Sequence, residues 1–395
     1  MSGGAAMIFS NARLFLGEEG FVRGSLSVRD GRFAKIAPER CLEGGEDLQG
    51  LTVLPGLVDL HIHGCMGQDF SDGKLSGLLS MGKQLARRGI TAFCPTSMTL
   101  PMEALAAAFK TADEYAKSRP AEGARMLGIH MEGPYFSEKK KGAQNRAFLR
   151  LPDAAEVLSL QGKCSRRLLF VDVAPELPGA EAFIREISKS CRVSIAHTNA
   201  SYEEAIRAFD AGASHITHLF NGMPELLHRK PGVVGAAYDR KNVTVELIGD
   251  GLHNHPSIVR MAFALFPGRV CLVSDALRCM GMPDGIYGLG GQKVFLSGGE
   301  AHLADGTLAG ASTDLFEDLV RVIRFGVPEK EAILAATRTP AMAAGAWDEI
   351  GSLEEGKYAD FIVCDANWRI RRVYVGGKKE ACISVAFKRK NGDEK

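Results

Sequence analysis

The sequence carries almost no net charge and no concentration of basic residues. Its 48 Lys and Arg residues offset 47 Asp and Glu residues, which leaves a formal net charge of +1 at pH 7. Nucleic acids and anionic membranes attract basic patches, so we expect neither as a partner. No apolar run approaches the roughly 18 residues of a membrane span, and the first residues lack a basic segment followed by an apolar core. These absences predict a cytoplasmic protein.

Two further motifs are missing. The nine cysteines include no Cys-x-x-Cys pair, and an odd number does not suit a disulfide framework. Reduced thiols in a cytosolic protein are the simpler explanation. The chain also lacks a Gly-x-x-x-x-Gly-Lys-Ser/Thr sequence, so any phosphate group must be bound by donors other than a P-loop.

The middle of the chain, residues 56–345, alternates apolar strand candidates with helical stretches. The strand candidates are GLVDLHIHG, TAFCPTS, RMLGIHMEG, LLFVDVAPE, RVSIAHTN, HITHLF, VTVELIGDG and VCLVSDA. Eight strand–helix units predict an α/β fold, a (β/α)8 TIM-like barrel whose active site is assembled at the carboxyl ends of the strands.

The two ends of the chain have a different character. At 395 residues the chain exceeds the roughly 250–300 residues at which one core stops growing, so a second, smaller unit is expected. Residues 1–55 and 346–390 contain short strand-like runs broken by turn signals such as Arg-Asp-Gly and Gly-Gly. We expect these segments to form one small β-sandwich domain beside the barrel of residues 56–345.

The run LPGLVDLHIHG ends in two histidines, His61 and His63. Residues i and i+2 of a strand lie on the same face, so both imidazoles can point at one metal ion beyond the strand. A hydrogen-bonded pair at the end of a sheet is the simpler alternative. Four further apolar runs end in a residue that a metal accepts: Glu132, His197, His218 and Asp275.

In a barrel these residues follow strands one, three, five, six and eight, and therefore meet at one mouth. Imidazole and carboxylate ligands without a thiolate suit zinc or iron(II) in a hydrolytic site, which keeps one position open for water. His215 lies at an odd spacing from His218. This spacing predicts the opposite face of the strand and a role in the core or around the ligands.

Several motifs resemble those of one family. They are HMEGPYFSEKKKGAQN, AHTNA, THLFNGMP, HRKPGVVGA, IGDGLHNHP, LVSDA and DGTLAGA. In their order and spacing they resemble the N-acetylglucosamine-6-phosphate deacetylase family of the amidohydrolase superfamily, over nearly the whole chain. The resemblance implies metal-dependent hydrolysis of the acetamide of N-acetyl-D-glucosamine 6-phosphate to D-glucosamine 6-phosphate and acetate, in amino-sugar catabolism or recycling.

The resemblance implies that Glu132, His197 and His218 bind a metal ion. Relatives that keep both histidines of the first strand, as this chain does, can hold a second ion with the glutamate bridging. We expect one or two ions of zinc or iron(II) per subunit. His61 and His63 then bind the second ion or, if only one ion is held, act as hydrogen-bond donors around it.

The resemblance further implies that Asp275 is the catalytic aspartate. Such a carboxylate takes a proton from the attacking water and returns it to the departing amine, which is a poor leaving group without it. The alternative for Asp275 is a helix N-cap directly after the strand.

The resemblance also implies contacts to the sugar and its phosphate. Arg229 is expected to reach in from a neighbouring subunit of a homodimer, although HRKP also fits an ordinary solvated charge run. Two positions depart from the family: Gln144 stands where many relatives have histidine, and Ala311 where they often have serine. The expected substrate contacts are Ala143, Gln144, Asn221, Gly222, Arg229, His253, Leu308, Ala309, Gly310 and Ala311.

Other functions remain open on the same fold. One is deacetylation of N-acetylgalactosamine 6-phosphate, and another is a different amidohydrolase reaction such as the opening of a cyclic amide. Cyclic amidases are expected to bridge their metals with a modified lysine, whereas Glu132 matches the bridging position here. A non-catalytic binding protein is the last alternative, although such a protein would have lost some of the metal ligands.

Overall fold

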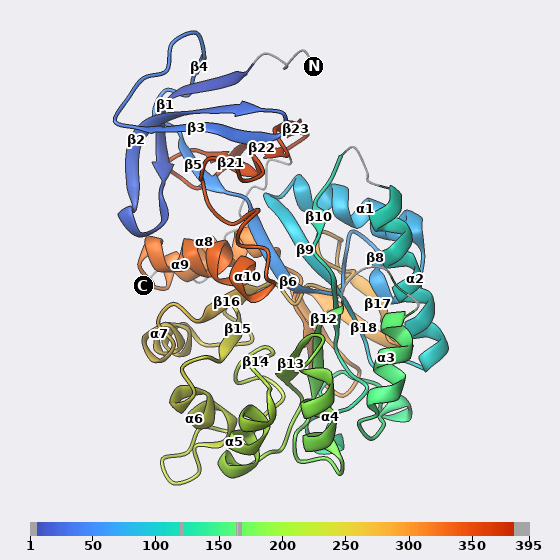
Figure 1. The fold of residues 1–395 in the computed structure, drawn as a ribbon. Helices are drawn as coiled ribbons and strands as arrows, with labels where there is room; N and C mark the ends of the chain where they lie inside the picture. The colour runs from blue at the N-terminus through green and yellow to red at the C-terminus, as the bar shows by residue number, and fades with distance from the viewer. Residues whose placement is uncertain (1–5, 119–121, 163, 165–167, 383–395) are drawn as a thin grey trace.

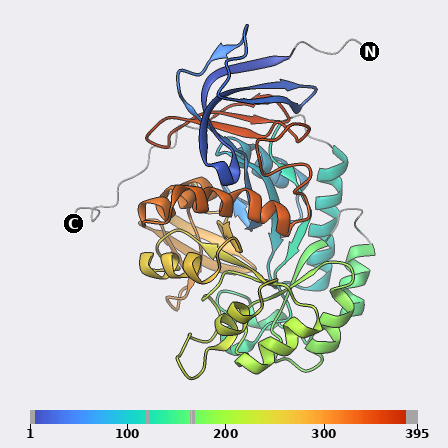
Figure 2. The ribbon, with the colours of Figure 1, turned by 60° about the vertical axis from the view of Figure 1, so that its left-hand side comes forward.

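The computed structural model describes residues 6–118, 122–162, 164 and 168–382. In Figure 1 a sheet built from both ends of the chain lies beside a larger body of strands surrounded by helices. Helices α8 (Leu315–Arg324), α9 (Glu329–Ala336) and α10 (Arg338–Ala343) lie between this terminal sheet and the barrel strands in Figures 1 and 2.

The larger body is a near-closed barrel of parallel strands, which confirms the predicted fold class. Each of the eight predicted segments forms a strand, and the third is split into two pieces. An isolated parallel bridge from Ile62 to Ala276 brings the last strand back to the first. In chain order the strands are β6 (Leu57–Ile62), β9 (Ile90–Ser97), β10 (Arg125–Met126), β11 (Ile129–Met131), β12 (Leu168–Val173), β13 (Arg192–Ile195), β14 (His215–Ile216), β15 (Thr244–Ile248) and β16 (Val270–Val273).

Burial on both faces explains the nearly continuous apolar sequences of the strands. All eight residues of β9, for example, are buried. Seven helices alternate with the strands on the outside: α1 (Leu75–Ala86), α2 (Met102–Ser118), α3 (Ala154–Gly162), α4 (Ala180–Ile187), α5 (Tyr202–Ala211), α6 (Gly232–Asp239) and α7 (Pro256–Leu265). In α5 a capping box between Ser201 and Glu204 satisfies free backbone N–H groups, and Ala205, Ala208 and Phe209 form the buried stripe.

Strands from both ends of the chain form the terminal sheet, in the order β23-β22-β21-β5-β1-β2-β3 with β4 on β1. The first five are β1 (Met7–Phe15), β2 (Phe21–Arg29), β3 (Arg32–Pro38), β4 (Glu46–Asp47) and β5 (Thr52–Pro55), and the last three are β21 (Phe361–Cys364), β22 (Ile370–Val375) and β23 (Lys378–Glu380). The Phe9 ring on β1 lies 5.5 Å from that of Phe361 and 5.2 Å from that of Tyr374. Because β5 separates β1 from β21, these contacts require the sheet to curl around its own core, as in a sandwich.

The predicted limits of this unit, 1–55 and 346–390, stay a prediction. Their parts before residue 6 and after residue 382 lie outside the described residues.

A small antiparallel sheet follows β16 and borders the barrel mouth. Gln292 Nε2 donates to the carbonyl of Ala143 at 2.6 Å, and Asn145 Nδ2 donates to that of Gly290 at 3.2 Å. The strands of this sheet are β17 (Gly285–Leu289), β18 (Gln292–Ser297), β19 (Glu300–His302) and β20 (Leu308–Gly310). The remaining short elements are the hairpin β7 (Gly64–Cys65) and β8 (Gln68–Asp69) and the 3-10 turns η1 (Gly17–Glu19), η2 (Phe70–Asp72), η3 (Glu138–Lys140) and η4 (Arg146–Phe148).

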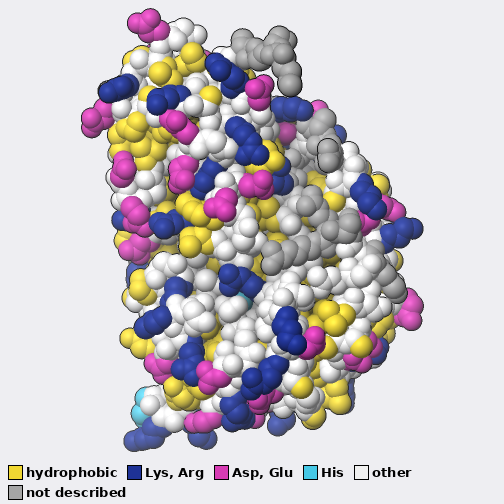
Figure 3. All heavy atoms as spheres, viewed as in Figure 1, with side chains coloured by type: hydrophobic (Ala, Val, Ile, Leu, Met, Phe, Trp, Pro, Cys, Tyr) yellow, Lys and Arg dark blue, Asp and Glu magenta, His cyan; other side chains and the backbone are white. Residues whose placement is uncertain are grey.

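The surface has a mixed charge pattern on the face that Figure 3 draws, where basic and acidic side chains are interspersed. None of the helices in the described ranges combines the length and the apolar character needed to cross a membrane. All nine cysteines lie in described ranges, none of them forms a disulfide, and seven of them are buried.

Gly56 joins the terminal sheet to the barrel, between β5 and β6, and its N–H donates to the carbonyl of Asp360 at 2.9 Å. An added Cβ atom would overlap the buried side chain of Thr91. Gly56→Ala should therefore lower the free energy of unfolding by about 1–3 kcal/mol, measured as a lower urea midpoint. Gly162→Ala is the matched control, because a Cβ there meets nothing within 4 Å; equal midpoints for both variants would contradict the prediction.

Candidate active site

Six residues predicted for the site lie together at the carboxyl ends of the barrel strands. All six are buried. They belong to or follow β6, β11, β13, β14 and β16, and they are His61, His63, Glu132, His197, His218 and Asp275.

Glu132 lies at the centre of this group. Its Oε1 atom lies 3.1 Å from His197 Nε2 and 3.2 Å from His218 Nε2. Its Oε2 atom lies 3.3 Å from His63 Nε2, and His61 Nε2 is 3.8 Å from Oε1. Two sets of three possible ligand atoms, each within 4.8 Å of one another, share this glutamate. The donor set fits a divalent metal, and the shared carboxylate can bridge two ions.

The Nδ1 atoms of the four imidazoles all face oxygen acceptors, so that the four Nε2 atoms point into the group. A donated Nδ1–H fixes the tautomer and leaves the Nε2 lone pair free for a metal. His61 Nδ1 lies 2.9 Å from the Glu246 carboxylate. The other three donate to backbone carbonyls: His63 to Thr96 at 3.1 Å, His197 to Lys140 at 2.9 Å, and His218 to Asn221 at 3.1 Å.

The backbone turns sharply where three of these residues leave their strands. His197, His218 and Asp275 have φ angles of 42°, 31° and 49°, in the left-handed region that is costly for side chains with a Cβ. Strand alternation therefore ends before His218. The predicted opposite orientation of His215 is wrong for this reason, because His215 Nε2 also reaches the barrel interior, 3.2 Å from Glu246.

Asp275 faces His61 and His63, the two histidines at the end of β6. Its Oδ1 atom lies 3.3 Å from His63 Nε2 and 3.5 Å from His61 Nε2. Burial alone would raise the pKa of this carboxyl, but its interactions with His61 and His63 lower the pKa below its usual value. The carboxylate is therefore ionised and able to accept a proton. The N-cap alternative is wrong, because the next helix after Asp275 is α8.

The pKa values in the metal-free group show how strongly its charges interact. Burial opposes every charged form, but hydrogen bonds from His197, His218 and His63 hold the pKa of Glu132 well below its usual value. In return Glu132 raises the pKa of His218 to about 9, and Asp275 and Glu132 raise that of His63 well above its usual value. Protons on His63 and His218 thus compensate the buried carboxylates.

Gln144 contacts the central glutamate directly. Its Oε1 atom accepts from the N–H of Thr99 at 2.8 Å, which fixes the orientation of the side-chain amide. Its Nε2 atom then donates to Glu132 Oε2 at 2.6 Å. The neighbouring Ala143 is buried, and its carbonyl accepts a hydrogen bond from the Gln292 side chain of β18.

Two more predicted contact residues, Asn221 and Gly222, lie beside the histidines, and a third, His253, pairs with Asp250. An added Cβ atom at Gly222 would lie 2.9 Å from His197 Nδ1, and Gly222 has a φ of 62°, so only glycine fits there without strain. Asn221 supplies the carbonyl that holds His218. His253 Nδ1 lies 2.7 Å from Asp250 Oδ2 and both side chains are largely buried.

The remaining predicted contacts divide into two groups. Leu308, Ala309 and Gly310 form β20, and Ala311 exchanges backbone hydrogen bonds with Asp275 and Leu277, which puts this stretch beside the catalytic candidate. Arg229 is apart from the group, within the exposed segment 225–230. Its NH1 atom lies 2.8 Å from His228 Nε2.

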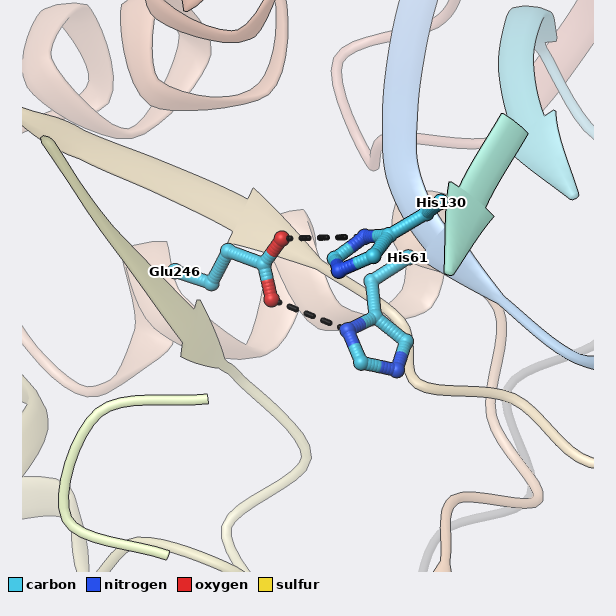
Figure 4. Close-up of side chains that lie close together, drawn as sticks. All are labelled: His61, His130 and Glu246. Atoms are coloured by element: carbon cyan, nitrogen blue, oxygen red, sulfur yellow. Dashed lines mark hydrogen bonds and ion pairs between the residues drawn. The ribbon is translucent and has the colours of Figure 1, made fainter. Parts of the chain in front are cut away.

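A buried polar network beneath the site was not predicted from the sequence. His130 Nε2 lies 2.9 Å from Asp172 Oδ1. Burial lowers the pKa of His130, but the charge of Asp172 outweighs burial and raises this pKa to about 9. Burial raises the pKa of Asp59 to about 7 despite a 2.6 Å bond from Ser274 Oγ. Glu246 lies between His61 and His130 (Figure 4). The sequence did contain a signal for this network, namely a charged or polar residue inside an otherwise apolar strand. Burying such a residue costs free energy unless it has hydrogen-bond partners, so its presence indicates a buried network.

Comparison with known proteins reveals extensive similarity. The chain is 38% identical over 332 residues to N-acetylglucosamine-6-phosphate deacetylase of Vibrio furnissii, covering 83% of this chain and 82% of that protein. It is 34% identical over 370 residues to N-acetylgalactosamine-6-phosphate deacetylase of Escherichia coli O157:H7, covering 93% and 97%.

Solved structures agree with this similarity. A mutant N-acetyl-D-glucosamine-6-phosphate deacetylase from Mycobacterium smegmatis, in complex with N-acetyl-D-glucosamine-6-phosphate, matches with a TM-score of 0.90 and 29% identity over 95% of this chain and 99% of that one. The sequence model described as the amidohydrolase family matches residues 52–389. With its barrel and its buried His/Glu groups, this chain belongs to the amidohydrolase family.

Proposed function

We propose that the protein hydrolyses the acetamide of N-acetyl-D-glucosamine 6-phosphate to D-glucosamine 6-phosphate and acetate, as a step in amino-sugar catabolism or recycling. The observation that carries this proposal is the position of Asp275 Oδ1, 3.3 Å from His63 in a group whose two possible metal sites share Glu132. Relatives named for this reaction cover most of the chain at more than 30% identity.

Zinc or iron(II) is the proposed metal, because both accept imidazole and carboxylate ligands. Glu132, His197 and His218 would hold the first ion, and His61, His63 and Glu132 the second, with one or two ions bound per chain. When bound, such a metal supplies water of lowered pKa and polarises the substrate carbonyl.

Asp275 is the proposed proton carrier. Its ionised carboxylate accepts a proton from the attacking water and donates it to the amine as the amide bond breaks. Gln144 presents its Nε2–H₂ group to the same space, because the N–H of Thr99 fixes the other end of the amide. This amide can donate a hydrogen bond to the substrate carbonyl without carrying charge.

The phosphate and sugar would be held by Asn221, Gly222, His253 and the stretch 308–311, with Ala143 beside Gln144. We propose that Arg229, exposed in its own chain, completes the phosphate site of the neighbouring subunit in a homodimer. Guanidinium suits this role because its planar fork donates two parallel charge-assisted bonds to phosphate.

Deacetylation of N-acetylgalactosamine 6-phosphate is the second candidate, favoured by the 34% identity to the relative named for it over 93% of this chain. The two sugars differ only in the configuration of one hydroxyl group. Comparing kcat/KM for the two 6-phosphates distinguishes the candidates.

Acetate release from N-acetylglucosamine 6-phosphate by the metal-loaded protein tests the proposal. Asp275→Asn should lower kcat by about 10²–10⁴-fold, because the proton transfer is lost, with a much smaller change in KM. Unphosphorylated N-acetylglucosamine should be a poor substrate. No release from either 6-phosphate would contradict the proposed function, and a variant with most of its kcat would contradict the role of Asp275.

Arg229→Ala should lower kcat/KM for the 6-phosphate by about 10- to 100-fold, since a hydrogen bond to a charged group contributes about 1.5–3 kcal/mol. The rate with the unphosphorylated sugar should not change. Lys230→Ala, at the exposed neighbouring position, is the matched control. An equal loss with both sugars, or none with either, would argue against phosphate recognition by Arg229.

Metal binding should release protons at pH 7, because the pKa of His218 is about 9 and that of His63 is also raised in the metal-free group. A metal must displace these protons, so its affinity should rise with pH up to about 9 and fall as the pH is lowered. Calorimetric titration with zinc in two buffers of different ionisation enthalpy measures the release. Equal apparent enthalpies in both buffers would refute it.

A further inference from the structure

The four imidazoles around Glu132 are not supported in the same way. His63, His197 and His218 donate their Nδ1–H groups to backbone carbonyls. His61 is held by a side chain, because its Nδ1 atom lies 2.9 Å from Glu246 Oε2. Figure 4 shows the Glu246 carboxylate, carried by β15, with one oxygen toward His61 and the other toward His130.

Glu246 itself is firmly positioned inside the barrel. It is fully buried, and its Oε1 atom lies 3.2 Å from His215 Nε2 and 3.7 Å from His130 Nδ1. Its Oε2 atom also accepts a longer bond of 3.3 Å from the N–H of His218. A carboxylate with partners from three other strands, β6, β11 and β14, has little freedom to rotate, so its direction imposes that of the His61 ring.

The consequence appears at the other nitrogen of His61. With Nδ1–H donated to Glu246, Nε2 carries the lone pair and lies 3.3 Å from His63 Nε2, 3.5 Å from Asp275 Oδ1 and 3.8 Å from Glu132 Oε1. Nε2 is therefore the atom that His61 offers to an ion in the group of His61, His63 and Glu132. Loss of the acceptor would free the ring to rotate and to place its proton on Nε2, which cannot then bind a metal.

We propose that Glu246 is a positioning residue for the second metal ion: by fixing the tautomer and direction of His61, it sets the affinity of the His61, His63 and Glu132 site. This inference rests on the metal dependence of the proposed function. The ion of the Glu132, His197 and His218 site depends on it less, because the imidazoles of that site are oriented by backbone carbonyls.

His61, His130 and Glu246 also lie close enough to hold a metal themselves. The hydrogen bonds of His130 argue against this use. Its Nδ1 atom lies 3.0 Å from the carbonyl of Leu60, and its Nε2 atom lies 2.9 Å from Asp172 Oδ1. Both nitrogens therefore act as donors and offer no lone pair to an ion. The trio is a hydrogen-bonded support for His61.

Zinc binding to the full chain tests the proposal. Wild-type protein equilibrated at fixed free zinc should hold two ions per chain, measured by elemental analysis and by calorimetric titration. Glu246→Ala should weaken the second ion by about 10–100-fold, the usual effect of losing a group that orients a ligand, and retain the first. Glu246→Gln keeps the shape and an acceptor oxygen, so it should fold normally and show a smaller loss.

Two controls separate positioning from general damage. Asp172→Asn alters another fully buried acid of the network, one that contacts His130 and Thr217 but none of the four imidazoles; it should keep both ions. His61→Ala should remove the same ion as Glu246→Ala, and the double variant should lose no more than His61→Ala alone, because one residue acts through the other.

Several results would overturn the inference: a wild-type protein that holds one zinc at saturation, a Glu246→Ala protein that holds the second ion as tightly as wild type, an equal loss in Asp172→Asn, or full additivity with His61→Ala. Failure of the proposed function has a different signature. A wild-type protein with two zinc ions that releases no acetate would refute the substrate and leave the role of Glu246 intact.

Discussion

The barrel mouth depends on one buried negative charge, the carboxylate of Glu132, which is only 2% exposed. A buried ion costs several kcal/mol unless partners compensate it. Here four imidazoles from three strands converge on it. Raised pKa values keep protons on two of these rings, His63 and His218, and a divalent cation satisfies the same demand when it displaces them. The strand ends are thus held around a site that requires positive charge in either state.

The barrel interior is divided along its length. Toward the terminal sheet it is filled by apolar side chains that pack against α10 and the segment after it, including Val58, Leu60, Ile248, Ala341 and Ile350. Toward the mouth it contains a polar network in which nearly every member has a partner. Such networks are rigid when they are satisfied. The apolar half supplies stability, and the polar half fixes the directions of the groups that face the substrate.

The eight strands could be predicted from the sequence, because each is a short apolar run bounded by turn residues. The metal-ligating and proton-accepting residues at the strand ends could be predicted as well. His61, Glu132, His197, His218 and Asp275 could be predicted because parallel strands bring their carboxyl ends to one mouth. Their orientations could not, since positive φ angles break the alternation that a sequence pattern assumes.

Other features were beyond a reading of local patterns. The partners of Glu246 lie on strands far apart in the chain, so no spacing reveals them. The sheet β17–β20 consists of short, half-exposed strands whose sequences show no strong alternation of apolar and polar residues. Its position at the mouth depends on tertiary contacts such as the hydrogen bond from Gln292 to Ala143. The bond from Gln144 to Glu132 likewise depends on how a loop crosses the mouth.

The pairing of β5 with β21 imposes an order on biosynthesis. These strands are antiparallel neighbours in the terminal sheet, yet the entire barrel separates them in the chain. At translation rates of about 5–20 residues per second, β5 leaves the ribosome on the order of tens of seconds before β21. During that interval one edge of the N-terminal strands is open to pairing with other chains. The nascent protein therefore passes through a stage in which chaperones have a specific edge to protect, and the last strands to be synthesised seal it.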